Sequence, residues 1–234
     1  MSNDLENLSH PVSPQWQAPD LVARFAANTP NYTLMEYAQN LWQRSDAPLK
    51  VLDIGGGAAR NAIPLAQLGM EVCCTDLSVP MLVAAQQKLE IEKPPGKVHL
   101  VQSPMFSLPF SDGQFDFVIA HGIWNLAQSG AEFRRAVSEA ARVAKSGASL
   151  FLFTFSRHTL PDDALPIADE RFIFTQFSGD PQCFLSEEEI LEELQAVGFA
   201  RVPAGPLTEH NRPAAPIREP HRPPVIYEGT FVRC

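Results

Sequence analysis

The sequence predicts an α/β fold in which helices cover both faces of a doubly wound parallel sheet. Short apolar runs alternate with helical patterns through residues 50–155, and the run 149–155 is apolar almost throughout. Such alternation is typical of parallel sheets, whose central strands are buried on both faces. Binding sites in these sheets lie at the carboxyl ends of the strands. The residues that directly follow each strand are therefore the first candidates for function.

The length and composition favour one main domain with additions. The chain has 234 residues, of which 45% are hydrophobic and 19% are charged. These values are ordinary for a globular protein, and a domain typically has ~150 residues. We expect residues 1–45 to form an N-terminal arm and helical cap. Residues 46–234 are expected to form the main domain, which includes a proline-rich segment at 203–224.

Charge and cysteine content narrow the range of partners. The chain has 18 Lys and Arg against 27 Asp and Glu, and the net charge of −9 argues against nucleic acid or an anionic membrane as the main partner. No apolar run approaches the ~18 residues of a membrane span, and the N-terminus lacks the pattern of a secretory signal. Cys73, Cys74, Cys183 and Cys234 lack metal-binding spacing, so we expect no metal site and a reducing, cytoplasmic location.

The segment before the first strand has a helical pattern. Apolar residues recur at spacings of three and four between Asp20 and Arg44, and the stretch 29–31 (Thr-Pro-Asn) interrupts them. Because the residue before a proline disfavours the helical conformation, two helices are expected there. Residues 1–19 are expected to form an irregular arm anchored by Trp16.

The strands and helices that follow are bounded by local signals. Strands are expected at 50–54, 71–75, 98–102, 115–120 and 149–155, and helices at 58–68, 79–90 and 131–144. Gly69 is a natural end for the first of these helices, which Pro64 is expected to kink. Ser78 is expected to cap the second helix, where Pro80 is tolerated in the first turn.

Regular alternation stops after residue 155. Residues 156–183 are expected to form an insertion with one short strand, in which Phe172, Phe174 and Phe177 form either an apolar lid or a hairpin packed on the core. A capping box at 186–189 opens a helix that ends at Gly198. Seven prolines within 203–224 exclude regular structure through the middle of that segment, and a last strand is expected at 225–232.

The most informative stretch is the strand that runs into Gly55, Gly56 and Gly57. Glycines allow a ligand to approach the backbone, and the helix that follows offers unpaired N–H groups. Asp76 stands at the end of the next strand, where a carboxylate can accept hydrogen bonds from both hydroxyls of a ribose. The arrangement indicates adenosine binding, whereas a turn that only joins strand to helix is the alternative interpretation.

Two adenosine cofactors compete for this loop. A dinucleotide fold requires G-x-G-x-x-G, and Arg60 stands at the position of the last glycine. The carboxylate of Asp53 would repel a pyrophosphate, but it suits a ligand that carries an ammonium and a sulfonium. S-adenosylmethionine is therefore favoured. An NAD-dependent oxidoreductase and a non-catalytic S-adenosylmethionine-binding module remain as alternatives.

Three segments carry a family resemblance: VLDIGGGAARNAIPLAQLGMEVCCTDLSVPML, LPFSDGQFDFVIA and SEAARVAKSGASLFLF. In order and spacing, they resemble the class I S-adenosylmethionine-dependent methyltransferases of the small-molecule type, over roughly 50–155. The resemblance implies a Rossmann-like sheet of about seven strands whose last strand is antiparallel, below an N-terminal helical cap. It also implies methyl transfer to a small-molecule acceptor. The chain departs from the family at Pro104, where an Asp that accepts from the adenine amine is common.

The resemblance assigns cofactor-binding roles to specific residues. Asp53 lies near the amino group of the methionine moiety, above Gly55, Gly56 and Gly57, and Asp76 holds the ribose. Leu77 packs against the adenine. Met105 and Phe106 flank the adenine and read it through their main chain, since the side chain of Pro104 cannot accept a hydrogen bond.

The residues proposed for the acceptor side follow later strands or lie in the cap. His121, at the end of the fourth strand, is expected to contact the cofactor, orient the acceptor or act as general base. Trp124 either forms a wall of the pocket or belongs to the core. Other candidates are Tyr32 and Tyr37 in the cap, and Arg157 and His158 after the fifth strand, either as acceptor ligand and base or as loop caps. The stretch HGIWN lacks the proline pair of amino-methylating DNA enzymes, so no nucleic-acid substrate is expected.

Overall fold

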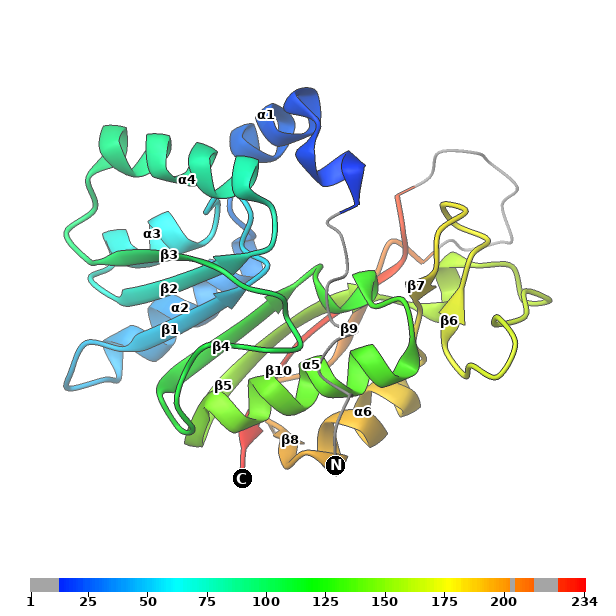
Figure 1. Ribbon diagram of the computed structural model, residues 1–234. Helices are drawn as coiled ribbons and strands as arrows, with labels where there is room; N and C mark the ends of the chain where they lie inside the picture. Colours follow the sequence, from blue (N-terminus) through cyan, green and yellow to red (C-terminus); the bar gives the residue numbers. More distant parts are fainter. Residues whose placement is uncertain (1–12, 203–204, 213–222) are drawn as a thin grey trace, which may run out of the picture.

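The computed structural model describes residues 13–202, 205–212 and 223–234 (Figure 1). Its main sheet has eight strands. They are β1 (Lys50–Ile54), β2 (Glu71–Asp76), β3 (Val98–Gln102), β4 (Phe115–His121), β5 (Ala144–Phe155), β8 (Phe199–Arg201), β9 (Thr208–His210) and β10 (Ile226–Arg233). The order is β3-β2-β1-β4-β5-β10-β8, and β9 pairs with β10.

The first five strands are parallel and the last is antiparallel. β1 pairs in parallel with β2 on one side and with β4 on the other. β10 runs antiparallel to β5, from Ile226 opposite Phe155 to Val232 opposite Ser149. The predicted doubly wound sheet with an antiparallel last strand is therefore confirmed. The strand order reverses between β1 and β4, and sheets of this kind bind ligands in the crevice at that point.

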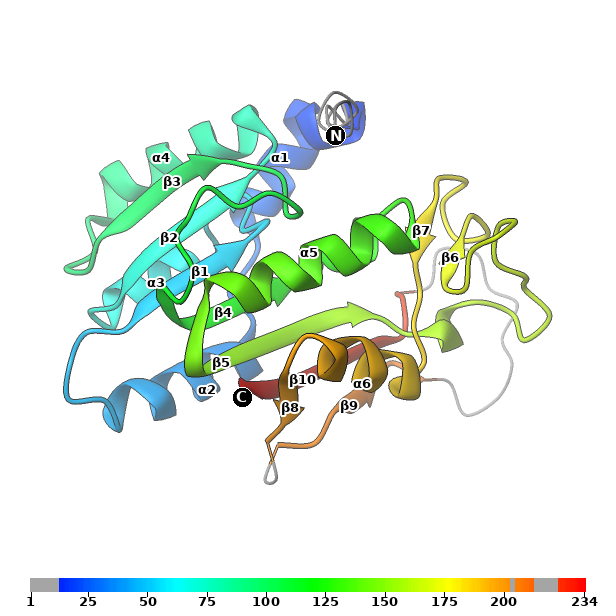
Figure 2. The ribbon, with the colours of Figure 1, turned by 60° about the horizontal axis from the view of Figure 1, so that its bottom comes forward.

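Helices cover both faces of the sheet, as Figures 1 and 2 show. The helices are α1 (Pro19–Ala27), α2 (Tyr32–Gln43), α3 (Ala62–Gln67), α4 (Val79–Glu92), α5 (Gly130–Val143) and α6 (Glu187–Ala196). Side chains alternate between the two faces along each strand. In β4, Phe117 and Ile119 pack with the α2–α4 layer, while Val118 and Ala120 pack with the α5–α6 layer.

The glycine loop is longer than the sequence analysis expected. Helix α3 begins at Ala62 rather than at residue 58, because Gly55, Gly57 and Ala59 adopt positive φ angles of 66°, 56° and 58°. Pro64 consequently lies in the first turn of α3, where its missing N–H removes no helical hydrogen bond. The kink expected from Pro64 was therefore a wrong prediction.

The insertion after β5 packs on the core. Strands β6 (Ile173–Phe174) and β7 (Gln182–Cys183) form an antiparallel pair. Phe172 and Phe174 are 1% and 3% exposed, whereas Phe177 is 41% exposed. None of these three phenylalanines lines the main cavity described below, so the structure selects the packed hairpin over the lid.

The helix predicted after the insertion is confirmed, with its capping box between Ser186 and Glu189. Strand β9 lies inside the predicted proline-rich segment, at a position where no strand was expected. The middle of that segment, 213–222, lies outside the described residues, as do residues 1–12 of the predicted arm. Among the described residues, no helix is long and apolar enough to cross a membrane.

Candidate functional site

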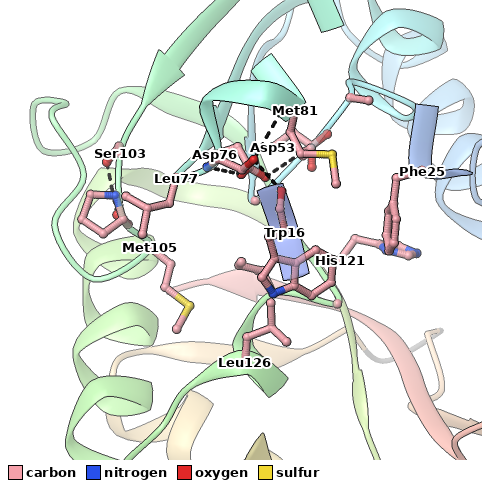
Figure 3. Close-up of a pocket in the computed structure, with 18 of the residues that line it drawn as sticks. Trp16, Phe25, Asp53, Asp76, Leu77, Met81, Ser103, Met105, His121 and Leu126 are labelled. Carbon is pink, nitrogen blue, oxygen red and sulfur yellow. Dashed lines mark hydrogen bonds between the residues drawn. The ribbon is translucent and has the colours of Figure 1, made fainter. Parts of the chain in front are cut away.

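A cavity of about 190 Å³ opens at the carboxyl ends of β1, β2 and β4 (Figure 3). It lies where the strand order reverses. All of the residues predicted to bind the cofactor line it, namely Asp53, Gly55, Gly56, Gly57, Asp76, Leu77, Met105, Phe106 and His121. The structure thus brings together residues from three separate strand ends and from the loop after β3.

The three glycines meet different requirements. Gly55 and Gly57 adopt left-handed backbone conformations that other residues rarely reach. At Gly56 the limit is space, because a Cβ atom would lie 2.6 Å from Cys74 Sγ and 2.7 Å from Asp53 Oδ2. The loop therefore holds its backbone close to the Asp53 carboxylate, which a side chain at Gly56 would displace.

The Asp76 carboxylate is oriented by the backbone around it. One oxygen accepts from the N–H of Gly57 at 3.0 Å, and the other accepts from the N–H of Ser78 at 2.7 Å. Burial raises the pKa of Asp76, and these backbone hydrogen bonds lower it. Each carboxylate oxygen has two acceptor positions. The carboxylate is consequently fixed in direction and still able to accept from two ligand hydroxyls.

Asp53 is the least satisfied polar group of the site. Its side chain is fully buried, and neither oxygen has a hydrogen-bond partner among the described residues. Burial raises the pKa of Asp53 to about 7; the charge of Arg60 opposes this rise and the charge of Asp76 adds to it. A buried carboxylate without a partner is costly unless a cation or donor arrives to pair with it. The site is thus suited to a ligand with a cationic group at this position.

His121 is the last residue of β4, and it is enclosed by three side chains. Its Nε2 lies 3.2 Å from Asn31 Nδ2, and its Nδ1 lies 3.0 Å from Arg60 Nη2. The ring stacks on Phe153 with centroids 4.3 Å apart. Burial, followed by the charge of Arg60, lowers the pKa of His121 to about 3. A general base needs a pKa near the working pH. The environment therefore opposes the general-base interpretation of His121.

One wall of the cavity is formed by the segment that precedes β1. Trp16, in a 3₁₀ helix (Pro14–Gln17), and Phe25 of α1 both line the cavity, and their rings meet edge to face at 5.4 Å. The hydroxyl of Ser78 donates to the Trp16 carbonyl at 2.8 Å and ties this segment to the start of α4. The sequence analysis treated Trp16 only as an anchor and gave Phe25 no role. No local pattern places either residue at the site, because the contact depends on how α1 packs.

Five residues that the sequence analysis assigned to the acceptor side do not line this cavity: Tyr32, Tyr37, Trp124, Arg157 and His158. Tyr32 is 80% exposed at the start of α2. Tyr37 packs on Phe117 and donates to Ser149 Oγ at 2.8 Å, on the sheet face below α2. Trp124 is 1% exposed, so the structure selects its core interpretation.

Arg157 and His158 have structural contacts instead. The Arg157 guanidinium lies over the Phe174 ring and donates to the carbonyls of Pro161 and Ala164. His158 Nδ1 lies 2.6 Å from Glu209 Oε1, across from β9. These contacts fasten the insertion and β9 to the end of β5, and they favour the loop-cap interpretation of Arg157 and His158 over the acceptor roles.

Other cavity residues were not predicted as ligands. They include Arg60, Asn61, Ile123, Leu126, Gln128 and Glu132. Arg60 entered the sequence analysis only as evidence against a dinucleotide loop. Its position directly after the glycines was a usable signal, whereas Ile123 and Leu126 follow β4 without any distinctive pattern.

Comparison with known proteins gives a consistent result. Residues 52–152 match a family described as a methyltransferase domain. A demethylmenaquinone methyltransferase of Corynebacterium efficiens is 34% identical over 113 residues, which cover 48% of this chain and 44% of that protein. The chain spans about half the length of the curated relatives that it matches first.

Solved structures share the fold. A methyltransferase from Methanosarcina mazei, described as dependent on S-adenosylmethionine, superposes with a TM-score of 0.67 at 19% identity, covering 87% of this chain and 98% of that chain. A 1,6-didemethyltoxoflavin N1-methyltransferase from Burkholderia thailandensis, solved with 1,6-didemethyltoxoflavin and S-adenosylhomocysteine bound, gives a TM-score of 0.62 at 16% identity and covers 85% and 77% of the two chains.

Proposed function

Because residues 52–152 match a methyltransferase-domain family, we propose that this protein transfers a methyl group from S-adenosylmethionine to a small-molecule acceptor. The observation that carries the proposal is the pair of carboxylates at the ends of adjacent strands. Asp53 is buried without a hydrogen-bond partner among the described residues, and Asp76 is fixed by backbone N–H groups. An ammonium for the first carboxylate and ribose hydroxyls for the second are both present in this cofactor.

Different residues bind different parts of the cofactor in this proposal. Asp53 faces the amino group, and the Gly55–Gly57 backbone lies beneath the methionine moiety. Asp76 receives the ribose, while Leu77, Met105 and Phe106 supply an apolar slot for the adenine. When bound, the cofactor supplies a methyl group that is already activated by its sulfonium. The protein therefore mainly has to align the acceptor and exclude water.

The acceptor is proposed to be a small molecule rather than a nucleic acid. The charged side chains that line the cavity are mostly acidic, namely Asp53, Asp76 and Glu132 against Arg60, so the cavity is not a basic groove. The net charge of −9 also disfavours a phosphate backbone. We propose further that residues 1–45 act as the cap of a domain formed by residues 46–234. The cysteines, all free in the described chain, support a cytoplasmic location.

Calorimetric titration tests the cofactor assignment. S-adenosylhomocysteine is expected to bind, and NAD is expected not to bind, because a pyrophosphate would meet the Asp53 carboxylate. Asp53→Asn should weaken S-adenosylhomocysteine binding, whereas Asp163→Asn, at an exposed position of the insertion, is a matched control. Binding of NAD alone would support the oxidoreductase alternative. Cofactor binding without methyl transfer to any acceptor of a broad panel would support the binding-module alternative.

A further inference from the structure

A chain of partly buried polar contacts leads away from the cavity at His121. Asn31, the N-cap of α2, lies between His121 and Glu228 of β10. Its Nδ2 is 3.2 Å from His121 Nε2 and 2.7 Å from Glu228 Oε1. Glu228 is only 6% exposed. Asn31 and Glu228 do not line the cofactor cavity, so the cofactor assignment gives them no role.

The direction of the Asn31 amide is fixed at both ends. Its Oδ1 accepts from the backbone N–H of Leu34 at 2.8 Å, which caps α2. Its Nδ2 donates to Glu228, because a carboxylate has acceptor oxygens and no donor. Turning the amide over would break both bonds. The group that Asn31 presents to His121 is therefore an N–H donor, and His121 Nε2 has to accept from it.

A neutral imidazole that accepts at Nε2 carries its proton on Nδ1. Arg60 does not contradict this tautomer, although its guanidinium is also a donor. Arg60 Nη2 lies at 3.0 Å from Nδ1 and at 3.5 Å from Nε2, so it can be in line with neither lone pair. It lies over a face of the ring, and Phe153 stacks on the other face. The His121 ring thus lies between Arg60 and Phe153, and its Nε2 contacts Asn31.

We propose that Asn31 and Glu228 are positioning residues for His121: they fix its imidazole as the neutral Nδ1–H tautomer at the wall of the cofactor cavity. Protonation at Nε2 would set a new N–H against the Asn31 donor and a positive charge beside Arg60. The charged groups around the His121 ring are Arg60 and, beyond Arg60, Asp53. Glu228 acts on the ring through Asn31. The other carboxylate oxygen of Glu228, Oε2, lies 3.5 Å from the imidazole of His210.

This arrangement bears on the acceptor, an inference that rests on the proposed methyl transfer. Because the Nε2 lone pair is occupied, His121 cannot take a proton from the acceptor. Methyl transfer to an acceptor that is nucleophilic at neutral pH, such as a neutral amine, a ring nitrogen or the oxygen of an acidic enol or phenol, needs no base. An acceptor such as an aliphatic alcohol would need a base other than His121, and Glu132 is a carboxylate that lines the same cavity.

Nitrogen NMR of histidine-labelled protein tests the tautomer directly, without any acceptor. The chain has six histidines, and His121→Gln identifies the signals of His121 by their loss. We expect His121 to show the Nδ1–H pattern and no titration between pH 5 and 8. An Nε2–H pattern, or a titration near the usual histidine pKa, would overturn the proposal.

Two variants test the positioning role. Asn31→Ser keeps a good N-cap but removes the amide donor, and Glu228→Gln removes the charge that fixes the amide. Each should convert the single Nδ1–H pattern into a mixture of tautomers. Asn40→Ser makes the same change at an exposed position of α2 and should leave the pattern as in wild type. If both variants keep the wild-type pattern, Asn31 and Glu228 do not position His121.

Binding of S-adenosylhomocysteine separates this inference from the proposed function. Asn31→Ser should change that affinity less than threefold, because Asn31 does not line the cavity. A wild-type protein with the expected tautomer but no affinity for S-adenosylhomocysteine would refute the proposed function and leave the positioning role standing. Normal affinity together with a titrating His121 would refute only the positioning role.

Discussion

The affinity for a cationic ligand should depend on the ionisation of Asp53. In the free protein the pKa of Asp53 is raised to about 7, because burial outweighs the charge of Arg60. A ligand ammonium pairs only with the ionised carboxylate. The ionised fraction is about one eleventh at pH 6 and about ten elevenths at pH 8. The affinity of S-adenosylhomocysteine should therefore be about tenfold higher at pH 8, equivalent to about 1.4 kcal/mol.

Isothermal titration calorimetry at pH 6 and pH 8 measures this difference. Asp53→Asn cannot ionise and should bind weakly with little dependence on pH, whereas Asp163→Asn should keep the wild-type dependence. Methylthioadenosine, which lacks the ammonium, should bind the wild type equally at both pH values. A wild-type affinity that is flat with pH, or an Asp53→Asn variant that retains the tenfold difference, would refute the assignment of the ammonium to Asp53.

The same group should make the free protein less stable as the pH rises. Below pH 3.8, the ordinary pKa of the side chain, the carboxyl is protonated in both the folded and unfolded states and has no effect. Between pH 3.8 and 7 the unfolded chain ionises while the folded one does not, so the free energy of unfolding falls, and the loss is complete above pH 7. The difference of about three pKa units corresponds to at most about 4 kcal/mol. Asp53→Asn should therefore be more stable than wild type at pH 8 by urea unfolding, and the two should converge at low pH.

Three further substitutions test other parts of the site. Asp76→Ala should weaken S-adenosylhomocysteine binding by ~1–3 kcal/mol in calorimetry, because it removes two ligand hydrogen bonds; an unchanged affinity would exclude the ribose role. Gly56→Val should abolish binding of S-adenosylhomocysteine, since the added Cβ would displace Asp53. Circular dichroism checks that the variant is folded. A folded variant with normal affinity would show that the glycine loop does not bind the cofactor. Arg157→Ala should lower the midpoint of thermal unfolding, because it removes the contact with Phe174 and bonds to two carbonyls, and should leave cofactor affinity unchanged. A large loss of cofactor affinity in a folded Arg157→Ala variant would show that Arg157 contributes to the site and is not only a structural contact.

The parts of the site that could be predicted from sequence are those in which one short segment determines its own geometry. The strand that ends in Gly55–Gly57 and the carboxylate at the end of the next strand are such segments. Parallel pairing then places Asp53 and Asp76 at the same edge of the sheet. The family resemblance, which agrees with the methyltransferase-domain match over residues 52–152, rests on these local patterns.

The acceptor side could not be predicted in the same way. The sequence analysis chose residues after β5 and in the cap because they were polar or aromatic and near the expected edge. In the structure, His158 contacts Glu209 of β9, a strand that pairs with β10, and Trp16 and Phe25 line the cavity from the N-terminal segment instead. Both outcomes depend on packing between segments far apart in the chain. A single sequence contains no periodic or spacing signal for them.

The electrostatics of the molecule locate the same site without reference to any relative. Among the described carboxylates and imidazoles, burial raises the pKa of Asp53 to about 7 and lowers that of His121 to about 3, and burial also shifts the pKa values of Asp76 and Arg60 beside them. Most other shifted carboxylates and guanidiniums belong to partly exposed ion pairs such as Arg142 with Glu139, where each partner stabilises the charge of the other. At the cavity the shifts have the opposite origin: burial opposes every charge there. Folding alone gives no reason to retain such a cluster, because apolar residues would be more stable. A ligand whose charge and hydroxyls complement the cluster does give that reason.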